Sequence, residues 1–151
     1  MAVGQEMNCP ECGARDTQCE PRYHECLVKE FTDAGYGDVH HLTVAAYMLQ
    51  HSSKLSLQGW RETHRLLKEF LIENKSPVEI RKQNKNNVDS GRRKWKITSN
   101  NGISKTSRTA WTKTILNVRL ENAEVYCADV TAWAKAALMD SEEITQYRSN
   151  P

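Results

Sequence analysis

Two cysteines near the start of the chain have the spacing of a metal half-site. Cys9 and Cys12 lie three positions apart in the stretch Cys-Pro-Glu-Cys-Gly. Two thiolates at this spacing on a tight turn can point at one zinc ion, and the small glycine lets the loop fold over it. Structural zinc takes four ligands, usually Cys and His. The stretch therefore predicts a metal site at the head of the chain, with two further ligands from elsewhere.

Cys19 is the expected third ligand, because it follows after a short loop, where the first helix should begin. The candidates for the fourth ligand are His51, then His24, then His40. A short loop joins the first two expected helices, so they should run antiparallel, which puts the end of the second beside Cys19. His40 and His51 are about 16 Å apart along that helix, so at most one can join the site. This geometry favours His51, and His24 and His40 stay open.

Other thiols and imidazoles have simpler interpretations. Cys26 falls on the apolar side of the first helix, and buried free cysteine is a common core residue. His64 falls on an apolar stripe and is expected to be a hydrogen-bonded core histidine, while Cys127 is expected to be inert. A Cys-x-x-Cys pair can also be a redox dithiol. That interpretation needs a strand before the motif, and none is expected there.

The remaining sequence must supply a scaffold for the site, and its size suits a single domain. The 151 residues are 38% hydrophobic, with a mean hydropathy of -0.71. No apolar run approaches the roughly 20 residues that span a bilayer, so no membrane partner is expected. Five cysteines, an odd number, without a basic and apolar leader predict a reducing, cytoplasmic location rather than a disulfide framework. We expect one zinc-binding helical domain over 1–140 and a flexible tail over 141–151.

The hydrophobic periodicity predicts a mainly α fold, a small helical bundle with a zinc-knuckle head. Ser76-Pro77-Val78-Glu79 has the pattern of a capping box that opens a short basic helix. Residues 92–98 alternate and could form a strand, or part of a hairpin near 92–115. The longer helices are expected at 19–31, 38–51, 56–74 and 122–139.

Particular residues are expected to cap these helices or face the core. Asp38 and Asn122 are the expected N-caps of the second and the last helix. Phe31 is expected on the inner side of the first helix. Ala132 and Trp133 are expected on the inner side of the last.

A basic segment in the middle of the chain is the candidate for binding an anion. Residues 75–113 carry eleven Lys and Arg against two acidic residues, a net charge of +9. Trp95 and Trp111 within it offer aromatic faces on which bases could stack. A solvated basic surface is the simpler interpretation. The residues expected to contact a nucleic acid or phosphate ligand are Arg92, Arg93, Lys94, Trp95 and Lys96.

Three functions compete at this point. The first is a structural zinc site that fastens the head to the helices of a binding protein of unknown biochemical role. The second is nucleic-acid or phosphate binding. The third is a metal-dependent hydrolase with Tyr47, His40 or His64 as an acid–base group. Three thiolate ligands argue against an enzyme, because catalytic zinc more often has His and carboxylate ligands. Zinc is the expected ion, with iron as the alternative.

Several motifs together resemble a bacterial family of small proteins of unknown function. The resemblance begins with the Cys-Pro-x-Cys-Gly head, Cys19 and the helix His-x-Leu-Thr-Val-x-x-Tyr-x-x-Gln-His that ends at His51. It covers nearly the whole chain and implies a Cys/His metal head on a helical body, with no established reaction or partner. The later motifs are Asp89-Ser90-Gly91-Arg92-Arg93-x-Trp95-Lys96-Ile97, Trp111-Thr112, Tyr126-Cys127 and Trp133-Ala134-Lys135.

Overall fold

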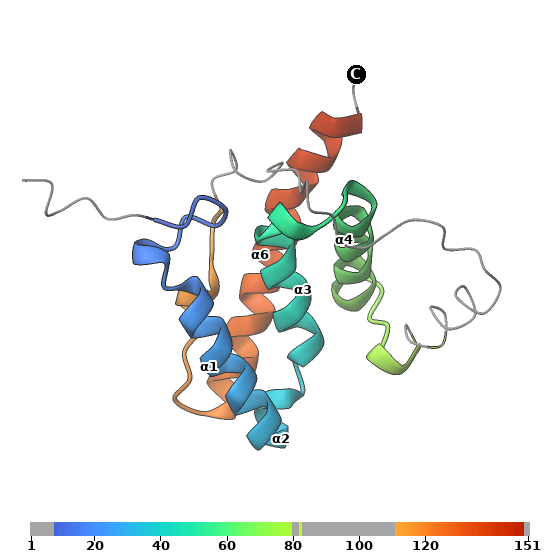
Figure 1. Cartoon of the computed structure of the whole chain (residues 1–151). Coiled ribbons are helices and arrows are strands. Elements are labelled where there is room, and N and C mark those ends of the chain that lie inside the picture. The colour runs from blue at the N-terminus through green and yellow to red at the C-terminus, as the bar shows by residue number, and fades with distance from the viewer. Residues whose placement is uncertain (1–7, 80–81, 83–110, 150–151) are drawn as a thin grey trace, which may run out of the picture.

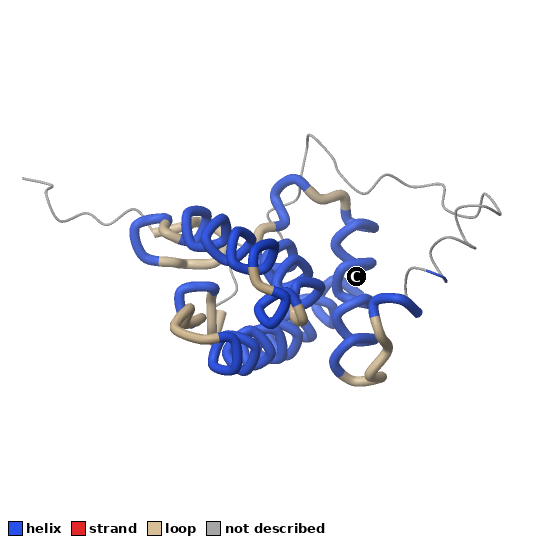
Figure 2. The backbone as a smooth tube through the Cα atoms, turned by 90° about the horizontal axis from the view of Figure 1, so that it is seen from below, coloured by secondary structure: helices blue, strands red, loops and turns tan. Residues whose placement is uncertain are grey.

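The computed structural model describes residues 8–79, 82 and 111–149, and these residues form a helical bundle (Figures 1 and 2). The mainly α fold is confirmed, with no strand among the described elements. The strand expected at 92–98 lies outside the described residues, and residues 111–115 of the expected hairpin are not a strand. The α-helices are α1 (Cys19–Thr32), α2 (Ala34–Gly37), α3 (His40–Gln50), α4 (Leu57–Leu71) and α6 (Ala123–Ser149). The 3-10 helices are η1 (Arg15–Thr17), η2 (Ser52–Lys54) and η3 (Ile115–Asn117).

Helix α3 lies at the centre of the bundle and packs against both α4 and α6 (Figure 1). Six of its eleven residues are buried, because apolar and small side chains occur on more than one of its sides. Trp60 of α4 donates its indole Nε1–H to the carbonyl of Leu49, 3.1 Å away. The largest fully buried side chains are Trp60, Trp133, Tyr126, Leu49, Leu55, Leu67 and Ile115.

Helices α1 and α3 run antiparallel, as the short connection between them predicts. The start of α1 lies beside the end of α3, where Cys19 approaches His51. The end of α1 lies beside the start of α3, where Glu30 contacts His40 and Thr43. The two helices are therefore joined at both ends by polar side chains.

The corner between α1 and α3 contains an additional helical turn, α2, that the sequence interpretation missed. Asp33 caps this turn by accepting from the backbone N–H of Gly35, 2.9 Å away. Asp38 is consequently not the N-cap of α3; Val39 has that position and makes no side-chain cap bond. A Cβ on Gly37 would lie 2.8 Å from the backbone oxygen of Glu30, so only glycine allows this close approach.

The apolar faces of α1 and α6 differ from those expected. Phe31 is 76% exposed, because α1 covers the bundle mainly through its contacts with α2 and η3 and leaves its outer side free. Cys26 is fully buried on the inner side, as expected. Ala132 is also exposed, because the inner face of α6 follows Tyr126, Val130, Trp133 and Ala137 at helical spacing.

Helix α6 begins where expected and ends later than expected. The side chain of Asn122 accepts from the N–H of Val125, 2.9 Å away, and thus caps the helix. The expected end at Met139 is wrong: the helix continues to Ser149, since no Gly or Pro occurs between Asp140 and Ser149 to stop it. Ser141 is fully buried. The division into a domain over 1–140 and a flexible tail over 141–151 stays a prediction.

Helix α4 agrees closely with its expected extent. Ser56 caps it by accepting from the N–H of Gly59, 2.9 Å away, and the helix ends at Leu71, before the expected end at residue 74. Beyond it, Ser76 accepts from the N–H of Glu79 at 3.2 Å, which is the first half of the expected capping box. In the described part of the chain, no helix combines the length and the apolar character that a bilayer crossing requires.

Candidate metal centre

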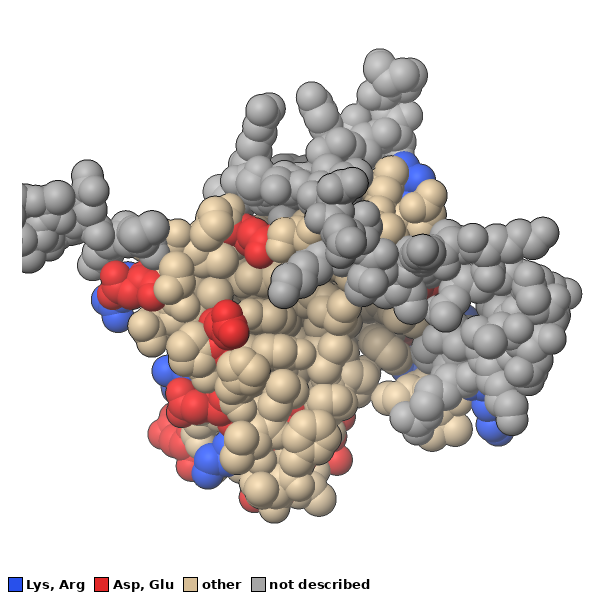
Figure 3. Space-filling model, in the orientation of Figure 1, with Lys and Arg blue, Asp and Glu red and all other residues tan. Residues whose placement is uncertain are grey.

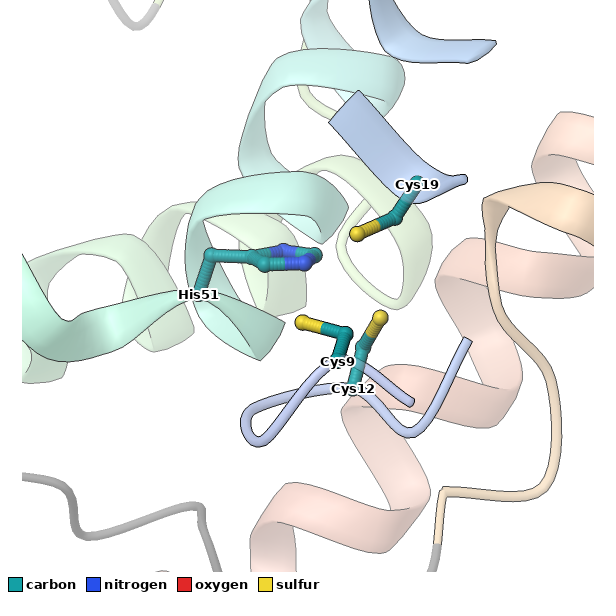
Figure 4. Close-up of side chains that lie close together, drawn as sticks. All are labelled: Cys9, Cys12, Cys19 and His51. Atoms are coloured by element: carbon teal, nitrogen blue, oxygen red, sulfur yellow. The ribbon is translucent and has the colours of Figure 1, made fainter. Parts of the chain in front are cut away.

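Four side chains from three separate segments meet at the head of the bundle. The sulfurs of Cys9, Cys12 and Cys19 and a ring nitrogen of His51 all lie within 4.8 Å of one another. Figure 4 shows them pointing toward a common centre. Donors in an ideal tetrahedral zinc site lie about 3.8 Å apart, because each Zn–S bond is about 2.3 Å. The cluster could therefore hold a metal ion after inward shifts of less than about 1 Å.

The turn that carries the first two cysteines has the form of a metal knuckle. The N–H of Gly13 donates to the carbonyl of Cys9 at 2.8 Å, and the N–H of Cys9 donates to the carbonyl of Ala14 at 2.9 Å. Gly13 has φ +79°, which glycine adopts without strain. The N–H of Ala14 points at the sulfur of Cys12, 3.4 Å away. Such a donor stabilises a thiolate and fixes its direction.

His51 at the end of α3 is oriented as a metal-binding imidazole is. Its Nδ1–H donates to the carbonyl of Tyr47, 2.8 Å away, and this bond fixes the tautomer. Its Nε2 is buried without a hydrogen-bond partner among the described residues. Burial also lowers the pKa of His51, so the ring is neutral at pH 7. A buried nitrogen with a free lone pair fits a metal ligand, because an orphaned acceptor would otherwise destabilise the fold.

The three thiols are held in different electrostatic surroundings. Burial raises the pKa of Cys12 and, together with the nearby Cys9, that of Cys19. Burial also raises the pKa of Cys9, but the backbone amides of Cys12 and Glu11 outweigh it and leave the pKa lowered. Three thiolates this close together repel one another, which disfavours the ionisation of all three. A bound cation would offset this repulsion and lower their pKa values.

The two alternative histidines, His24 and His40, lie outside the cluster of Cys9, Cys12, Cys19 and His51. His24 is exposed on α1, and its Nε2 is 3.7 Å from the carboxylate of Glu20. His40 is on the far end of α3, where its Nδ1 lies 2.7 Å from the carboxylate of Glu30. Neither belongs to the cluster. The residues expected to bind an anion (Arg92, Arg93, Lys94, Trp95 and Lys96) lie outside the described residues.

Two hydrogen bonds that hold the knuckle in place were not predicted from the sequence. The carboxylate of Glu11 accepts from the N–H of Ser53, 2.7 Å away, and thus ties the knuckle to η2. The indole Nε1–H of Trp111 donates to the carbonyl of Glu11 at 2.9 Å. Trp111, considered above as a base-stacking residue, therefore supports the metal centre. Its place in the resemblance motif was the only signal that it had a role.

An aromatic stack extends outward from the centre. The ring of Tyr47 lies 4.0 Å from the ring of His51 at 19°, and 3.8 Å from the ring of Tyr23 at 1°. A cleft of about 910 Å³ opens beside this stack, and Cys9, Cys19 and His51 line it. The centre can thus be reached from one side.

A second buried polar cluster lies at the opposite end of α1 and α3, and we call it the Glu30 cluster. It consists of Glu30, His40, Thr43 and Tyr126. One oxygen of the Glu30 carboxylate accepts from Thr43 at 2.6 Å and from the Tyr126 hydroxyl, and the other contacts Nδ1 of His40. The carboxylate is 1% exposed. Every oxygen of this buried group has a partner, so the cluster is complete without an ion.

The other thiols and the core histidine lie outside both clusters. Cys26 is fully buried, and burial raises its pKa to about 11, as suits an inert core thiol. Cys127 is half-buried and donates to the carbonyl of Gly35, 3.2 Å away. His64 is buried as expected, but the expected hydrogen bond is not found at its Nε2, which lies 3.8 Å from the carboxylate of Glu142, too far for a hydrogen bond, and has no partner among the described residues.

Comparison with known proteins gives one match, to a family model. No curated protein and no solved structure matches it significantly. A family model described as "Family of unknown function (DUF5946)" matches residues 7–142. This match includes the metal centre, the Glu30 cluster and all the α-helices except the end of α6. The chain belongs to this family of unknown function.

Proposed function

We propose that Cys9, Cys12, Cys19 and His51 bind one structural zinc ion that fastens the knuckle to α1 and α3. The observation that carries this proposal is the buried Nε2 of His51, which has no hydrogen-bond partner in the described part of the chain, on a ring that clusters with three sulfurs. Three thiolates and one imidazole are a common ligand set of structural zinc, and thiolates favour zinc over hard cations.

The ion has a structural role in this proposal, because four protein ligands leave no coordination position for a substrate. Without an ion, the knuckle is held mainly by the hydrogen bonds of Glu11 and by its own turn. Asp16 and Thr17 between the knuckle and α1 have φ values of 55° and 52°, which disfavour this turn on its own. Coordination of the flanking Cys12 and Cys19 would offset that strain.

A cytoplasmic location fits this proposal. All five cysteines are free, and a reducing compartment keeps thiols available for a metal. The basic segment over 75–113 remains the predicted surface for an anionic partner.

The proposal is tested by elemental analysis and X-ray absorption on the purified protein. We expect one equivalent of zinc, with three sulfur neighbours at about 2.3 Å and one nitrogen neighbour at about 2.0–2.1 Å. Cys19→Ser and His51→Gln should each lower the zinc content to well below one equivalent. Cys127→Ser is the matched control and should keep it. Full zinc content in both ligand variants would overturn the assignment.

A further inference from the structure

The cleft beside the metal centre has the size of a small-molecule site. Its volume of about 910 Å³ lies at the upper end of the roughly 300–1,000 Å³ typical of ligand pockets. The knuckle, the start of α1, the end of α3 and η2 surround it. Three of the four metal-centre residues line it, whereas Cys12 does not. A molecule in this cleft would therefore lie directly against the metal centre.

One wall of the cleft is aromatic and already ordered. Tyr23 and Tyr47 both line it, and their rings are stacked in parallel at 3.8 Å. The inner ring, Tyr47, is stacked in turn on His51. Stacked rings lose little conformational freedom when a ligand arrives, so this wall is preorganised. Aromatic rings and phenolic oxygens attract a cation and its N–H groups.

The carboxyl groups of Glu11 and Glu20 line the cleft, and no Lys or Arg is among the described residues that do so. The imidazole of His24 also lines it, with its Nε2 3.7 Å from the carboxylate of Glu20. Glu20 lies at the rim, with its side chain 75% exposed. On the α1 side of the face in Figure 3, acidic side chains lie with Lys and Arg among them. Three thiolates around one zinc ion would add a further net charge of −1. The combined field favours a cation and repels phosphate.

We propose that this cleft binds an organic monocation whose head group is a guanidinium or an ammonium. The inference rests on the proposed zinc site for part of the negative charge, and on Glu20 and the tyrosines for the rest. The ligand differs in sign from the anion predicted for the basic segment. The chain would then have two binding surfaces that take opposite charges.

The test is an NMR titration of the zinc-loaded full chain with N-acetyl-L-arginine amide. We expect saturable shifts of the backbone amides of Glu20 and Tyr23. The N-acetyl-L-citrulline amide, which has the same shape and no charge, should bind at least ten-fold more weakly. The N-acetyl-L-lysine amide distinguishes the two head groups, and tight binding of either cation supports the proposal. Equal binding of the citrulline compound, or no saturable shift with either cation, would overturn it.

Two charge-removing variants on α1 localise the effect. Glu20→Gln should weaken binding about two- to five-fold, the effect of one exposed charge pair. Glu25→Gln removes the same charge from the same helix outside the cleft and should leave binding unchanged. Equal effects of the two would show only general attraction to an acidic surface, against the proposal. Zinc is measured in the same samples, so full zinc without binding contradicts the cleft proposal alone.

Discussion

The two ends of the α1–α3 pair each bury a cluster of polar side chains, and they differ in how those side chains find partners. At one end, Cys19 of α1 meets His51 after α3, and Nε2 of His51 has no hydrogen-bond partner among residues 8–79, 82 and 111–149. At the other end, Glu30 of α1 meets His40 and Thr43 of α3, and every carboxylate oxygen has a donor. Both clusters are buried and polar. Of the two clusters, the first alone leaves a lone pair, that of His51 Nε2, without a partner in the described structure. This difference favours the first cluster as the one that could hold an ion.

The largest expected difference between the two ends is the loss of stability when the ion is removed from the metal centre. A strong chelator should lower the free energy of unfolding by about 5 kcal/mol or more, which corresponds to roughly 10–20 °C in Tm for this size. Thermal unfolding followed by circular dichroism measures it. The variant His51→Gln, which should lack the ion already, serves as the control and should show no further loss. An unchanged Tm in the wild type would contradict a structural role.

The next largest effect concerns the Glu30 cluster. Glu30→Gln leaves Thr43 and Tyr126 without a charged acceptor and should cost about 3 kcal/mol in a denaturant titration. The zinc content should remain at one equivalent, since the cluster is at the opposite end of the helices. The exposed Glu25→Gln should change stability by less than about 0.5 kcal/mol. Loss of zinc in Glu30→Gln would show that the two ends are not independent.

Protons should compete with the ion at the metal centre. Burial raises the pKa values of Cys12 and Cys19, so both are protonated at pH 7 before the ion binds and must release their protons. His51 has a lowered pKa and is already neutral, so it releases none. Zinc affinity should therefore fall by at least about a hundred-fold for each unit that the pH decreases below 7.5, a factor of about ten for each of these two thiols. Competition with a chromophoric chelator, corrected for its own protonation, measures this slope; a flat profile would contradict it.

A smaller effect is expected at the support of the knuckle. Trp111→Phe keeps an aromatic ring and removes the donor to the carbonyl of Glu11, which should cost about 1 kcal/mol. The zinc should remain bound but exchange faster with a chelator. Stopped-flow exchange kinetics compare the variant with the wild type, and identical rates would remove Trp111 from the metal centre.

The smallest effect is expected for the alternative ligand His24. Its side chain is 66% exposed, with its Nε2 3.7 Å from the carboxylate of Glu20 and its ring 6.2 Å from that of Tyr23. His24→Ala should leave both Tm and zinc content unchanged, within about 0.5 kcal/mol in stability. A loss of zinc in this variant would instead reopen the choice of the fourth ligand.

The sequence predicted contacts that follow from local rules better than it predicted long-range ones. The short connection between two helices was enough to place His51 beside Cys19, and the spacing of Cys9 and Cys12 was enough to predict a knuckle. Asp38 was a reasonable N-cap by type, but an extra helical turn capped by Asp33 displaced it. Such corners depend on small differences between neighbouring caps.

The Glu30 cluster was not predictable in this way. Glu30 follows Lys29 near the end of a polar helix and has the appearance of a surface residue. Its burial depends on Tyr126, 96 positions later, so no local pattern contains the pair. Phe31 shows the converse: an aromatic residue at helical spacing is exposed, with the ring of His40 at 5.3 Å as its neighbour and no core around it in the described structure. Hydrophobic periodicity identifies which residues share one face of a helix, but it does not show which element packs against that face.

The close contact at Gly37 has a consequence at a distance. The missing side chain there lets α2 lie against the backbone of Glu30 at the corner from which α3 leaves, so a side chain at residue 37 would have to shift this corner. Helix α3 then acts as a lever about 16 Å long. A tilt of about 5° at residue 37 would move its far end by about 1.4 Å over that length, while metal–ligand distances tolerate about 0.2 Å. An alanine at residue 37 would thus loosen the hold on an ion that it never touches.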